Sequence, residues 1–166
     1  TPPEYGKYHF DGHRNCNVQR TPEETRKLGK QCPKCQQELT IGVEYRVEEL
    51  ADRPVGYVKP NAPYFHSLIP LHELLGAVYD IKLMTSKKIT QLYQQLIGKF
   101  GTEYNILLEV SEPALAQVVN PQLAKVILLN RAKAIPIQAG FDGVYGKLML
   151  DKSYLMKNSQ THLNRF

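Results

Sequence analysis

Apolar residues recur with the period of about 3.6 residues of an amphipathic helix through much of the second half of the chain. One such helix is predicted over residues 70–79. A longer one begins after Ser86, whose hydroxyl can cap its first turn, and ends near Phe100, just before Gly101. The two apolar faces comprise Leu71, Leu74, Leu75 and Val78 in the first helix and Ile89, Leu92, Tyr93, Leu96 and Ile97 in the second.

Shorter elements are predicted around these two helices. The apolar run at residues 104–110 is too continuous for a surface helix and predicts a buried strand. Residues 135–150 alternate between apolar and polar and contain three glycines, which predicts a hairpin with tight turns. Further helical patterns lie at residues 43–52, 111–119 and 120–134, and a short strand is expected at residues 38–41.

Every cysteine of the chain lies in two short pairs, His13-x-x-Cys16 and Cys32-x-x-Cys35. Two intervening residues let both ligands of a pair point from one turn at one metal ion. The 15 residues between the pairs form a loop long enough to bring the second turn opposite the first. Zinc prefers four ligands in a tetrahedron, so this spacing indicates a structural Cys₃His zinc site with no open catalytic position.

The loop between the two pairs is itself predicted to contain a helix. Thr21 can cap it, Pro22 suits the first helical position, and Glu24 completes a capping box. Gly29 is expected to end this helix just before the second pair. The module therefore differs from a minimal zinc ribbon, which carries a plain hairpin at this place.

Other interpretations of these residues stay open. Three cysteines cannot all pair within one chain, so free thiols with a loop histidine are the plain alternative. A redox C-x-x-C pair would need a βαβ context that this stretch does not show. His9 is an alternative to His13 as fourth ligand, although it lies seven residues from Cys16 and lacks the two-residue spacing.

Composition points to an anionic partner and away from a membrane. The net charge is +5, with a sequence pI of about 9.0. No apolar run reaches membrane-spanning length and no signal peptide is visible. Reduced cysteines with metal spacing indicate a cytoplasmic protein. The chain begins Thr-Pro-Pro without Met, which predicts a fragment whose missing part lies on the N-terminal side.

Basic residues are candidates for phosphate contact. Several surround the predicted metal site, Arg14 among them. Lys87 and Lys88 directly follow the Ser86 cap, and a helix N-terminus offers free N–H groups and a positive dipole. Two lysines at that end predict a phosphate site, and a solvated cationic face is the alternative.

A glycine-rich stretch is the second candidate for nucleic-acid contact. Between residues 138 and 147, glycines alternate with Phe141, Tyr145 and Lys147. Exposed aromatic rings beside a flexible backbone can stack on bases, with Lys147 close by in sequence. Tight turns that bury their aromatics are the structural alternative. No carboxylate or histidine cluster suits a hydrolase with several metals, and no nucleophile elbow is present, so no catalytic site is predicted.

Several segments resemble endonuclease Q-like proteins, in the part that follows their nuclease domain. The resemblance covers nearly all of residues 6–150. Its most specific parts are the metal-ligand run and the Gly-Phe-Asp-Gly-Val-Tyr-Gly stretch. The segments are residues 6–16, 32–35, 40–53, 65–71, 86–88 and 140–147.

The resemblance implies a role in DNA repair. Members of this family carry an N-terminal, metal-dependent nuclease domain of the polymerase-and-histidinol-phosphatase type. They cut DNA on the 5′ side of deaminated bases such as uracil and hypoxanthine, and at abasic sites. A zinc-binding domain and a helical C-terminal region help to grip the damaged strand. The family's zinc ligands carry over onto His13, Cys16, Cys32 and Cys35. The catalytic residues do not, because this chain lacks the nuclease domain.

These observations combine into an expected α+β fold. A small Cys₃His zinc-binding module over residues 1–58 precedes a mostly helical, DNA-engaging region over residues 59–150, which ends in a β-hairpin. A stretch at residues 53–63 that contains proline and glycine marks the boundary. The polar tail at residues 151–166 has a composition compatible with disorder.

Two functions from different classes follow. In the first, the chain is the non-catalytic DNA-binding and damaged-base-recognition part of a repair nuclease, with structural Zn²⁺, and its partners are DNA and the N-terminal nuclease domain. In the second, it is a zinc-stabilised module that docks a nuclease or helicase domain without binding DNA. The expected DNA contacts are Arg14, Ser86, Lys87, Lys88, Tyr145 and Lys147.

Overall fold

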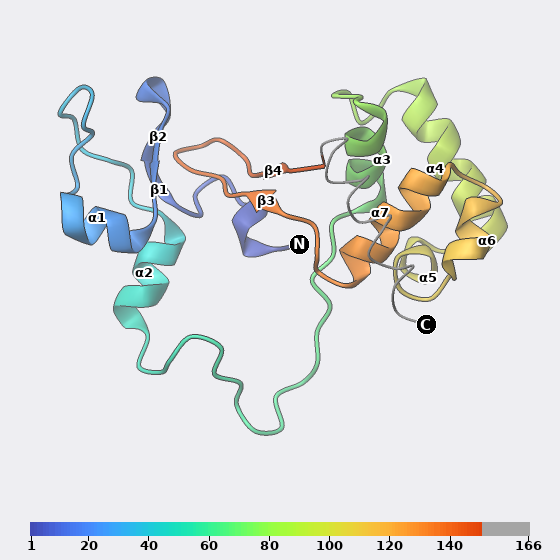
Figure 1. Cartoon of the computed structure of the whole chain (residues 1–166), viewed down its shortest axis with the longest axis horizontal. Helices are drawn as coiled ribbons and strands as arrows, with labels where there is room; N and C mark the ends of the chain where they lie inside the picture. Colours follow the sequence, from blue (N-terminus) through green and yellow to red (C-terminus); the bar gives the residue numbers. More distant parts are fainter. Residues whose placement is uncertain (151–166) are drawn as a thin grey trace, which may run out of the picture. The chain divides into compact units, whose positions relative to one another are not determined.

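The computed structural model describes residues 1–150, and the predicted tail at residues 151–166 lies outside the described residues. The chain divides into two compact units (Figure 1). The N-terminal unit comprises Pro2–His66 and Ile137–Lys147, and the helical unit consists mainly of Ser67–Pro136. Helices and two short two-stranded sheets occur together, which confirms the predicted α+β class.

The N-terminal unit begins with an antiparallel hairpin, in which Asp11 pairs with Arg20 and His13 with Val18. The capping box predicted after this hairpin is present. The Thr21 hydroxyl accepts a hydrogen bond from the Glu24 amide, and the Glu24 carboxylate accepts one from the Thr21 amide. The elements are η1 (Pro3–Tyr5), β1 (Asp11–His13), η2 (Arg14–Cys16), β2 (Val18–Arg20), α1 (Pro22–Leu28) and α2 (Val43–Leu50).

The core next to the metal-ligand pairs is small. Val18, Cys32 and Leu39 form one buried cluster, and Cys16 packs against it. The short strand predicted at residues 38–41 is reduced to isolated bridges. In one of them the Thr40 amide donates to the Gly12 carbonyl at 2.8 Å and the Gly12 amide donates back at 2.9 Å. Backbone pairing therefore contributes much of the local order here.

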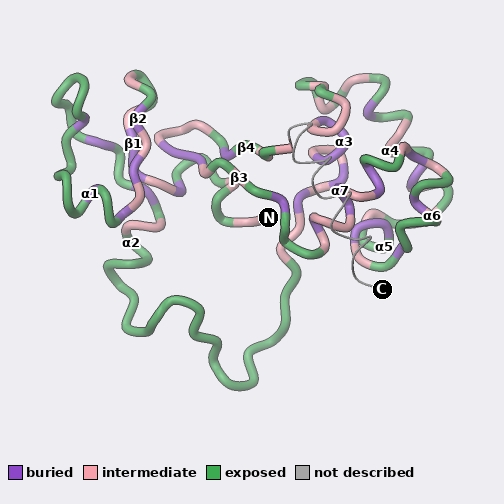
Figure 2. The backbone as a smooth tube through the Cα atoms, in the orientation of Figure 1, coloured by how far each residue is buried: buried purple, intermediate pink, exposed green. Residues whose placement is uncertain are grey.

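The helical unit has the larger apolar core. α7 (Pro121–Arg131) packs against α3, α5 and α6, and Figure 2 shows buried positions along these helices. The other helices are α3 (Leu71–Tyr79), α4 (Lys87–Phe100), α5 (Glu103–Leu108) and α6 (Glu112–Ala116). Side chains with at most 1% exposure include Ile69, Leu71, Leu74, Leu75, Ile89, Leu96, Ile106, Leu115, Leu123, Val126 and Ile127.

The strand predicted at residues 104–110 is wrong, because this segment forms the helix α5. The Thr102 side chain caps it by accepting a hydrogen bond from the Asn105 amide at 3.1 Å. Ile106 and Leu107 are both buried. A short apolar run that is buried on most sides has the same pattern in a helix as in a strand. None of the described helices combines the length and apolar content needed to cross a membrane.

The predicted C-terminal hairpin is present as a short ladder between β3 (Ile137–Gln138) and β4 (Lys147–Leu148). Its residues 137–147 group with the N-terminal unit. The proline- and glycine-containing stretch lies in a fully exposed segment, residues 51–66, without helix or strand (Figure 2). The division of the chain at residue 58 stays a prediction.

One buried polar side chain, Asn130 on α7, generates a stability prediction. It is 3% exposed, and its amide accepts from the Ile69 amide at 3.0 Å and donates to the Ile69 carbonyl at 2.9 Å. Asn130→Ala leaves both backbone groups without a partner, so we expect a loss of about 2–4 kcal/mol in the free energy of unfolding. Urea unfolding followed by circular dichroism measures this loss.

The matched control is Gln122→Ala, which removes an exposed amide side chain from the same helix. We expect a change within about 0.5 kcal/mol for this variant. Equal effects of the two substitutions would contradict a structural role for the Asn130 amide.

Candidate metal centre and nucleic-acid interface

The structure brings the four predicted metal ligands together. His13 ends β1, Cys16 ends η2, and Cys32 and Cys35 lie on the turn that follows α1. Their ligand atoms all lie within 4.8 Å of one another, and His13 Nδ1 is 3.2 Å from Cys35 Sγ. Among the described residues no other group meets this condition. These four side chains can therefore hold a metal ion.

The ligand geometry and the donor types fit zinc. Zinc–sulfur bonds of about 2.3 Å in a tetrahedron separate the ligand atoms by roughly 3.8 Å, so small shifts would suffice. Burial by itself raises the pKa of the Cys32 thiol, but hydrogen bonds from the backbone N–H groups of Cys35 and Lys34 outweigh it and lower the pKa to about 6. These hydrogen bonds favour the thiolate of Cys32, which is the metal-binding form, whereas a hydrogen bond with the Cys35 side chain raises the pKa of Cys16 to about 11. Four protein ligands would make the site structural.

Hydrogen bonds outside the ligand set hold the two turns in place. Lys34 Nζ donates to the Cys16 carbonyl at 2.7 Å and so ties the second turn to the first. Arg20 is 9% exposed and donates to the carbonyls of Gly29 and Gln31 at 2.8 and 3.2 Å. The segment between α1 and Cys32 is therefore fixed to β2. His9 is not part of the group, and the geometry favours His13 as the fourth ligand.

The glycine-rich stretch packs closely against the start of the chain. The Gly140 amide donates to the Glu4 carbonyl at 2.9 Å, and the Gly146 amide donates to the Tyr5 carbonyl at 3.1 Å. A Cβ atom at Gly140 would lie 2.2 Å from the Gly6 carbonyl oxygen, so only glycine allows this approach.

The two aromatic residues of this stretch have opposite environments. Phe141 is 6% exposed and belongs to the core, as expected if the tight turns bury their aromatic residues. Tyr145 is 63% exposed and free to meet a ligand. The stretch thus serves packing at one ring and leaves the other on the surface.

Asp142 ties this exposed loop to the metal site. Its carboxylate accepts hydrogen bonds from the Arg14 amide at 2.7 Å and from the Thr40 hydroxyl at 2.6 Å. Partial burial opposes the charged form, but these hydrogen bonds and the Arg14 charge outweigh it and lower the pKa of Asp142. The carboxylate is therefore ionised at neutral pH and holds the loop beside η2.

An exposed group of four residues, here named the basic aromatic patch, lies on the N-terminal unit. It comprises Lys7, Tyr8, Arg14 and Tyr145. Lys7 Nζ is 5.5 Å from the centre of the Tyr8 ring and 5.7 Å from that of Tyr145. Both Tyr8, 45% exposed, and an Arg14 guanidinium nitrogen lie near Gly143, in the same loop as Tyr145. Sequence reasoning missed Lys7 and Tyr8, because no spacing links them to residue 145.

The other predicted DNA contacts are exposed or lie at a helix end. The Ser86 hydroxyl accepts from the Ile89 amide at 3.4 Å and so caps α4, as predicted. Lys87 is exposed, whereas Lys88 Nζ lies 4.7 Å from the centre of the Tyr79 ring. Lys147 is exposed on β4. The structure thus distributes the predicted contacts over both units.

A metal-ligand group in a small unit and a separate bundle of short helices together define an endonuclease Q-like fold, and solved structures show this fold. The lesion-specific endonuclease PfuEndoQ from Pyrococcus furiosus matches with a TM-score of 0.82 and 28% identity, over 99% of this chain and 40% of that one. An endonuclease Q in complex with a 27-mer duplex, with an abasic lesion at the active site, matches with a TM-score of 0.77 and 29% identity, over 92% and 38%.

Sequence comparisons agree with the fold. Residues 70–134 match the family model described as the MJ0043 C-terminal domain. The uncharacterized protein MJ0043 of Methanocaldococcus jannaschii is 34% identical over 88% of this chain and 18% of its own length. The uncharacterized protein YqxK of Bacillus subtilis is 32% identical over 88% and 33%. The chain thus spans at most a third of these two relatives.

The metal site generates a prediction about His13. We expect His13→Ala to lose stoichiometric zinc and to lower the melting temperature, because three ligands leave the shell incomplete. His13→Cys should retain zinc, because a thiolate is also a zinc ligand. Metal analysis of purified protein, with a thermal melt of the same sample, provides both readouts.

The control for this experiment is His72→Asn, which replaces a partly exposed histidine on α3 outside the ligand group and should leave the zinc content unchanged. Full zinc retention by His13→Ala would exclude His13 as a ligand.

Asp142 generates a second prediction for this site. Asp142→Ala removes two hydrogen bonds to a charged acceptor, and alanine is also strained at the observed φ of 42°. We expect a loss of about 2 kcal/mol in the free energy of unfolding. Asp142→Asn should cost less, because asparagine tolerates this φ and keeps acceptor atoms. Chemical denaturation of zinc-loaded protein measures both, and a larger cost for Asn than for Ala would contradict this account.

Proposed function

We propose that this chain is the non-catalytic DNA-binding and damaged-base-recognition part of an endonuclease Q-like repair nuclease that acts on deaminated bases. The basic aromatic patch is the observation that carries this proposal. It presents two exposed tyrosine rings together with Lys7 and Arg14. The endonuclease Q-like fold supports it, since one structural neighbour was solved with a lesion-containing duplex.

The chemistry of the patch suits a displaced nucleotide. An enzyme that acts on a damaged base has to take the base out of the stack. Exposed aromatic side chains such as Tyr145 stack on bases of any sequence, and basic side chains such as Arg14 neutralise the neighbouring phosphates. Zn²⁺ bound by the Cys₃His group would hold the loop that carries Arg14, and would supply no chemical step of its own.

The helical unit would add binding to the DNA backbone. The first amides of α4, at Lys87 and Lys88, have no acceptor within the helix and can bind a phosphate beside the Ser86 cap. Lys147 would contribute from β4. Cleavage would belong to an N-terminal nuclease domain as partner, and a cytoplasmic location remains part of the proposal.

A second candidate function is a zinc-stabilised module that docks a nuclease or helicase domain without binding DNA. One observation favours it. The apolar residues of α2 that the sequence places on one face, Val43, Val47 and Leu50, are 61%, 52% and 66% exposed. An exposed apolar face on α2 does not exclude DNA binding elsewhere on the chain. An experiment therefore has to distinguish the two candidate functions.

The test is a salt titration of binding to a short duplex with one deoxyuracil or deoxyinosine, against an undamaged duplex, with zinc-loaded protein. We expect Tyr145→Ala to weaken binding by about 1–3 kcal/mol, the usual contribution of one stacked base. Replacing Lys87 and Lys88 with alanine should reduce the salt slope by nearly one for each phosphate that the variant no longer neutralises. Fluorescence anisotropy measures both effects.

Tyr104→Ala serves as the control, because Tyr104 is a 72% exposed tyrosine on α5 outside the patch. Equal losses of affinity for Tyr104→Ala and Tyr145→Ala would remove the patch from the binding site. Absence of salt-sensitive binding by zinc-loaded protein would favour the docking module.

A further inference from the structure

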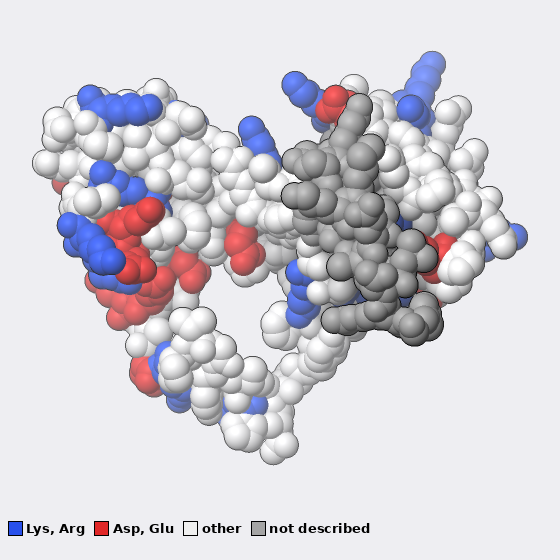
Figure 3. Space-filling model, viewed as in Figure 1, with Lys and Arg blue, Asp and Glu red and all other residues white. Residues whose placement is uncertain are grey.

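The N-terminal unit contains an acidic cavity that the proposed DNA contacts do not use. Its volume is about 510 Å³, and it lies among the start of the chain, the first turn of α1 and one side of α2. Four carboxylates line it, and no lysine or arginine does; the acidic residues are Glu4, Glu23, Glu44 and Glu48. Figure 3 shows acidic atoms gathered beside α2. A surface of this sign repels phosphates, so the cavity calls for a different ligand.

A buried histidine gives an independent indication of a ligand. His9 lines the cavity and is 8% exposed. Its backbone groups pair with Gly6 and Glu44, but no hydrogen bond to its ring nitrogens occurs among the described residues. The ring nitrogens are not fully buried either. Among the described residues, the fully buried side-chain nitrogen and oxygen atoms without a hydrogen-bond partner are Asp11 Oδ2 and Thr25 Oγ1, and no atom of His9 is among them. The ring is thus a nearly buried polar group with access to a ligand in the cavity.

The size and ligand spacing argue against a metal ion. In the described residues, the His13 and cysteine group alone has ligand atoms close enough together to hold one. No three of the cavity carboxylates and His9 form such a group. A volume of about 510 Å³ instead suits a long organic cation.

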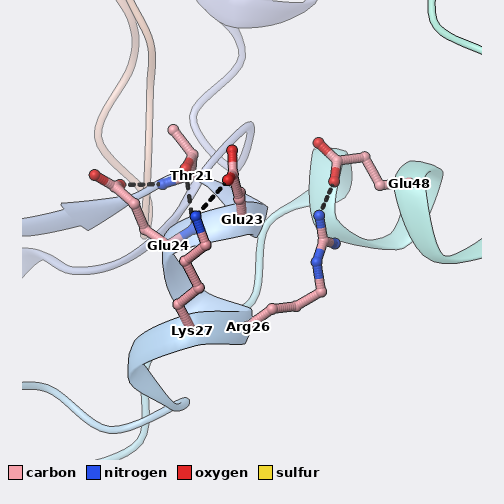
Figure 4. Close-up of polar contacts among 6 residues, drawn as sticks. All are labelled: Thr21, Glu23, Glu24, Arg26, Lys27 and Glu48. Atoms are coloured by element: carbon pink, nitrogen blue, oxygen red, sulfur yellow. Dashed lines mark hydrogen bonds and ion pairs between the residues drawn. The ribbon is translucent and has the colours of Figure 1, made fainter.

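The walls match an arginine side chain in particular. Pro3, Phe10 and Pro22 provide apolar surface against which the methylene stem of arginine can pack. Carboxylates can accept the planar guanidinium through paired hydrogen bonds. The unit already contains an arginine–carboxylate contact at the cavity, where Arg26 of α1 donates one hydrogen bond to Glu48 of α2 (Figure 4).

Two of the four carboxylates remain available for an incoming cation. Glu23 is paired with Lys27 at 2.6 Å, and Glu48 with Arg26 (Figure 4). Glu4 and Glu44 form no ion pair within the described residues. Together with His9 they give the cavity unused acceptors on two sides.

The exposed face of α2 indicates that the arginine comes on a polypeptide. Val43, Val47 and Leu50 lie on one side of the helix, and Glu44 and Glu48 follow Val43 and Val47 by one position, or about 100° around the axis. An apolar strip therefore runs beside the acidic cavity. A free polyamine or amino acid would leave this apolar strip exposed to solvent. A peptide with apolar residues next to an arginine would cover both the strip and the cavity.

We propose that the acidic cavity is a docking site for an arginine side chain on an apolar segment of a partner protein. The arginine enters between Glu4 and Glu44 and meets His9, and the flanking apolar residues cover Val43, Val47 and Leu50. This site is separate from the basic aromatic patch, so the chain can bind DNA and a protein partner on different surfaces of one unit.

The test uses the full zinc-loaded chain and a short peptide with one arginine between leucines, titrated by calorimetry or NMR. A second peptide carries citrulline in place of arginine, which keeps the shape and removes the charge. We expect the arginine peptide to bind about tenfold more tightly, as is usual for a hydrogen-bonded charge pair. Glu44→Gln should remove most of this preference.

The matched control is Glu49→Gln, which removes a charge from the same helix outside the cavity, at a residue paired with Arg46. We expect it to keep the preference for arginine, with unchanged zinc content and circular dichroism in both variants. Equal affinity of the two peptides, or no binding at millimolar peptide, would overturn the proposal. If Glu44→Gln and Glu49→Gln reduced the preference for arginine equally, the preference would come from the overall charge of the helix and not from the cavity, which would also overturn the proposal. DNA affinity, measured in parallel, tests the proposed function separately.

Discussion

The N-terminal unit depends on one constraint, the cross-link that a metal ion would form between the four side chains able to hold it. The buried cluster around Cys32 contains only Val18 and Leu39 besides the cysteine. A core of this size cannot by itself offset the conformational entropy of the loops around it. Bringing His13 and Cys16 together with Cys32 and Cys35 fixes the hairpin of β1 and β2 against the turn after α1. Metal binding in such a unit is part of the folding free energy.

The surface that we propose for DNA depends on this cross-link for its position. Arg14 directly follows the candidate ligand His13, and its amide donates to Asp142, which lies in the same loop as Tyr145. A displacement at the metal site would therefore reach the exposed tyrosine through one carboxylate. The same unit carries the acidic cavity, formed by α1 and α2 with the start of the chain. The acidic cavity and the basic aromatic patch have no residue in common, and their unlike charge favours a different partner for each.

The helical unit is organised differently, and the sequence determined most of it. Its apolar residues at the period of about 3.6 predicted α3 and α4 closely, and the capping residues Ser86 and Gly101 marked the ends of α4. Local signals sufficed because each helix buries one face and shows the other to water. The segment that forms α5 was wrongly predicted as a strand because its sequence lacks this contrast between a buried and an exposed face. Two adjacent buried residues, Ile106 and Leu107, allow either a strand or a helix until the surrounding core is known.

The sequence by itself predicted the group of four side chains that can hold a metal ion and the helix inside its loop, because two-residue spacing and a capping box are local chemical requirements. Only the tertiary structure decided which exposed side chains act together. Lys7 meets Tyr145 and Tyr8 lies near Gly143, each across more than 130 positions of the chain. The apolar residues of α2 are exposed. Likewise Glu4, His9 and Glu44 line one cavity, although their spacing in the sequence does not predict that they lie together. Such groupings depend on how backbone segments approach one another, as Gly140 does to Gly6, and residue order does not encode that approach in a local pattern.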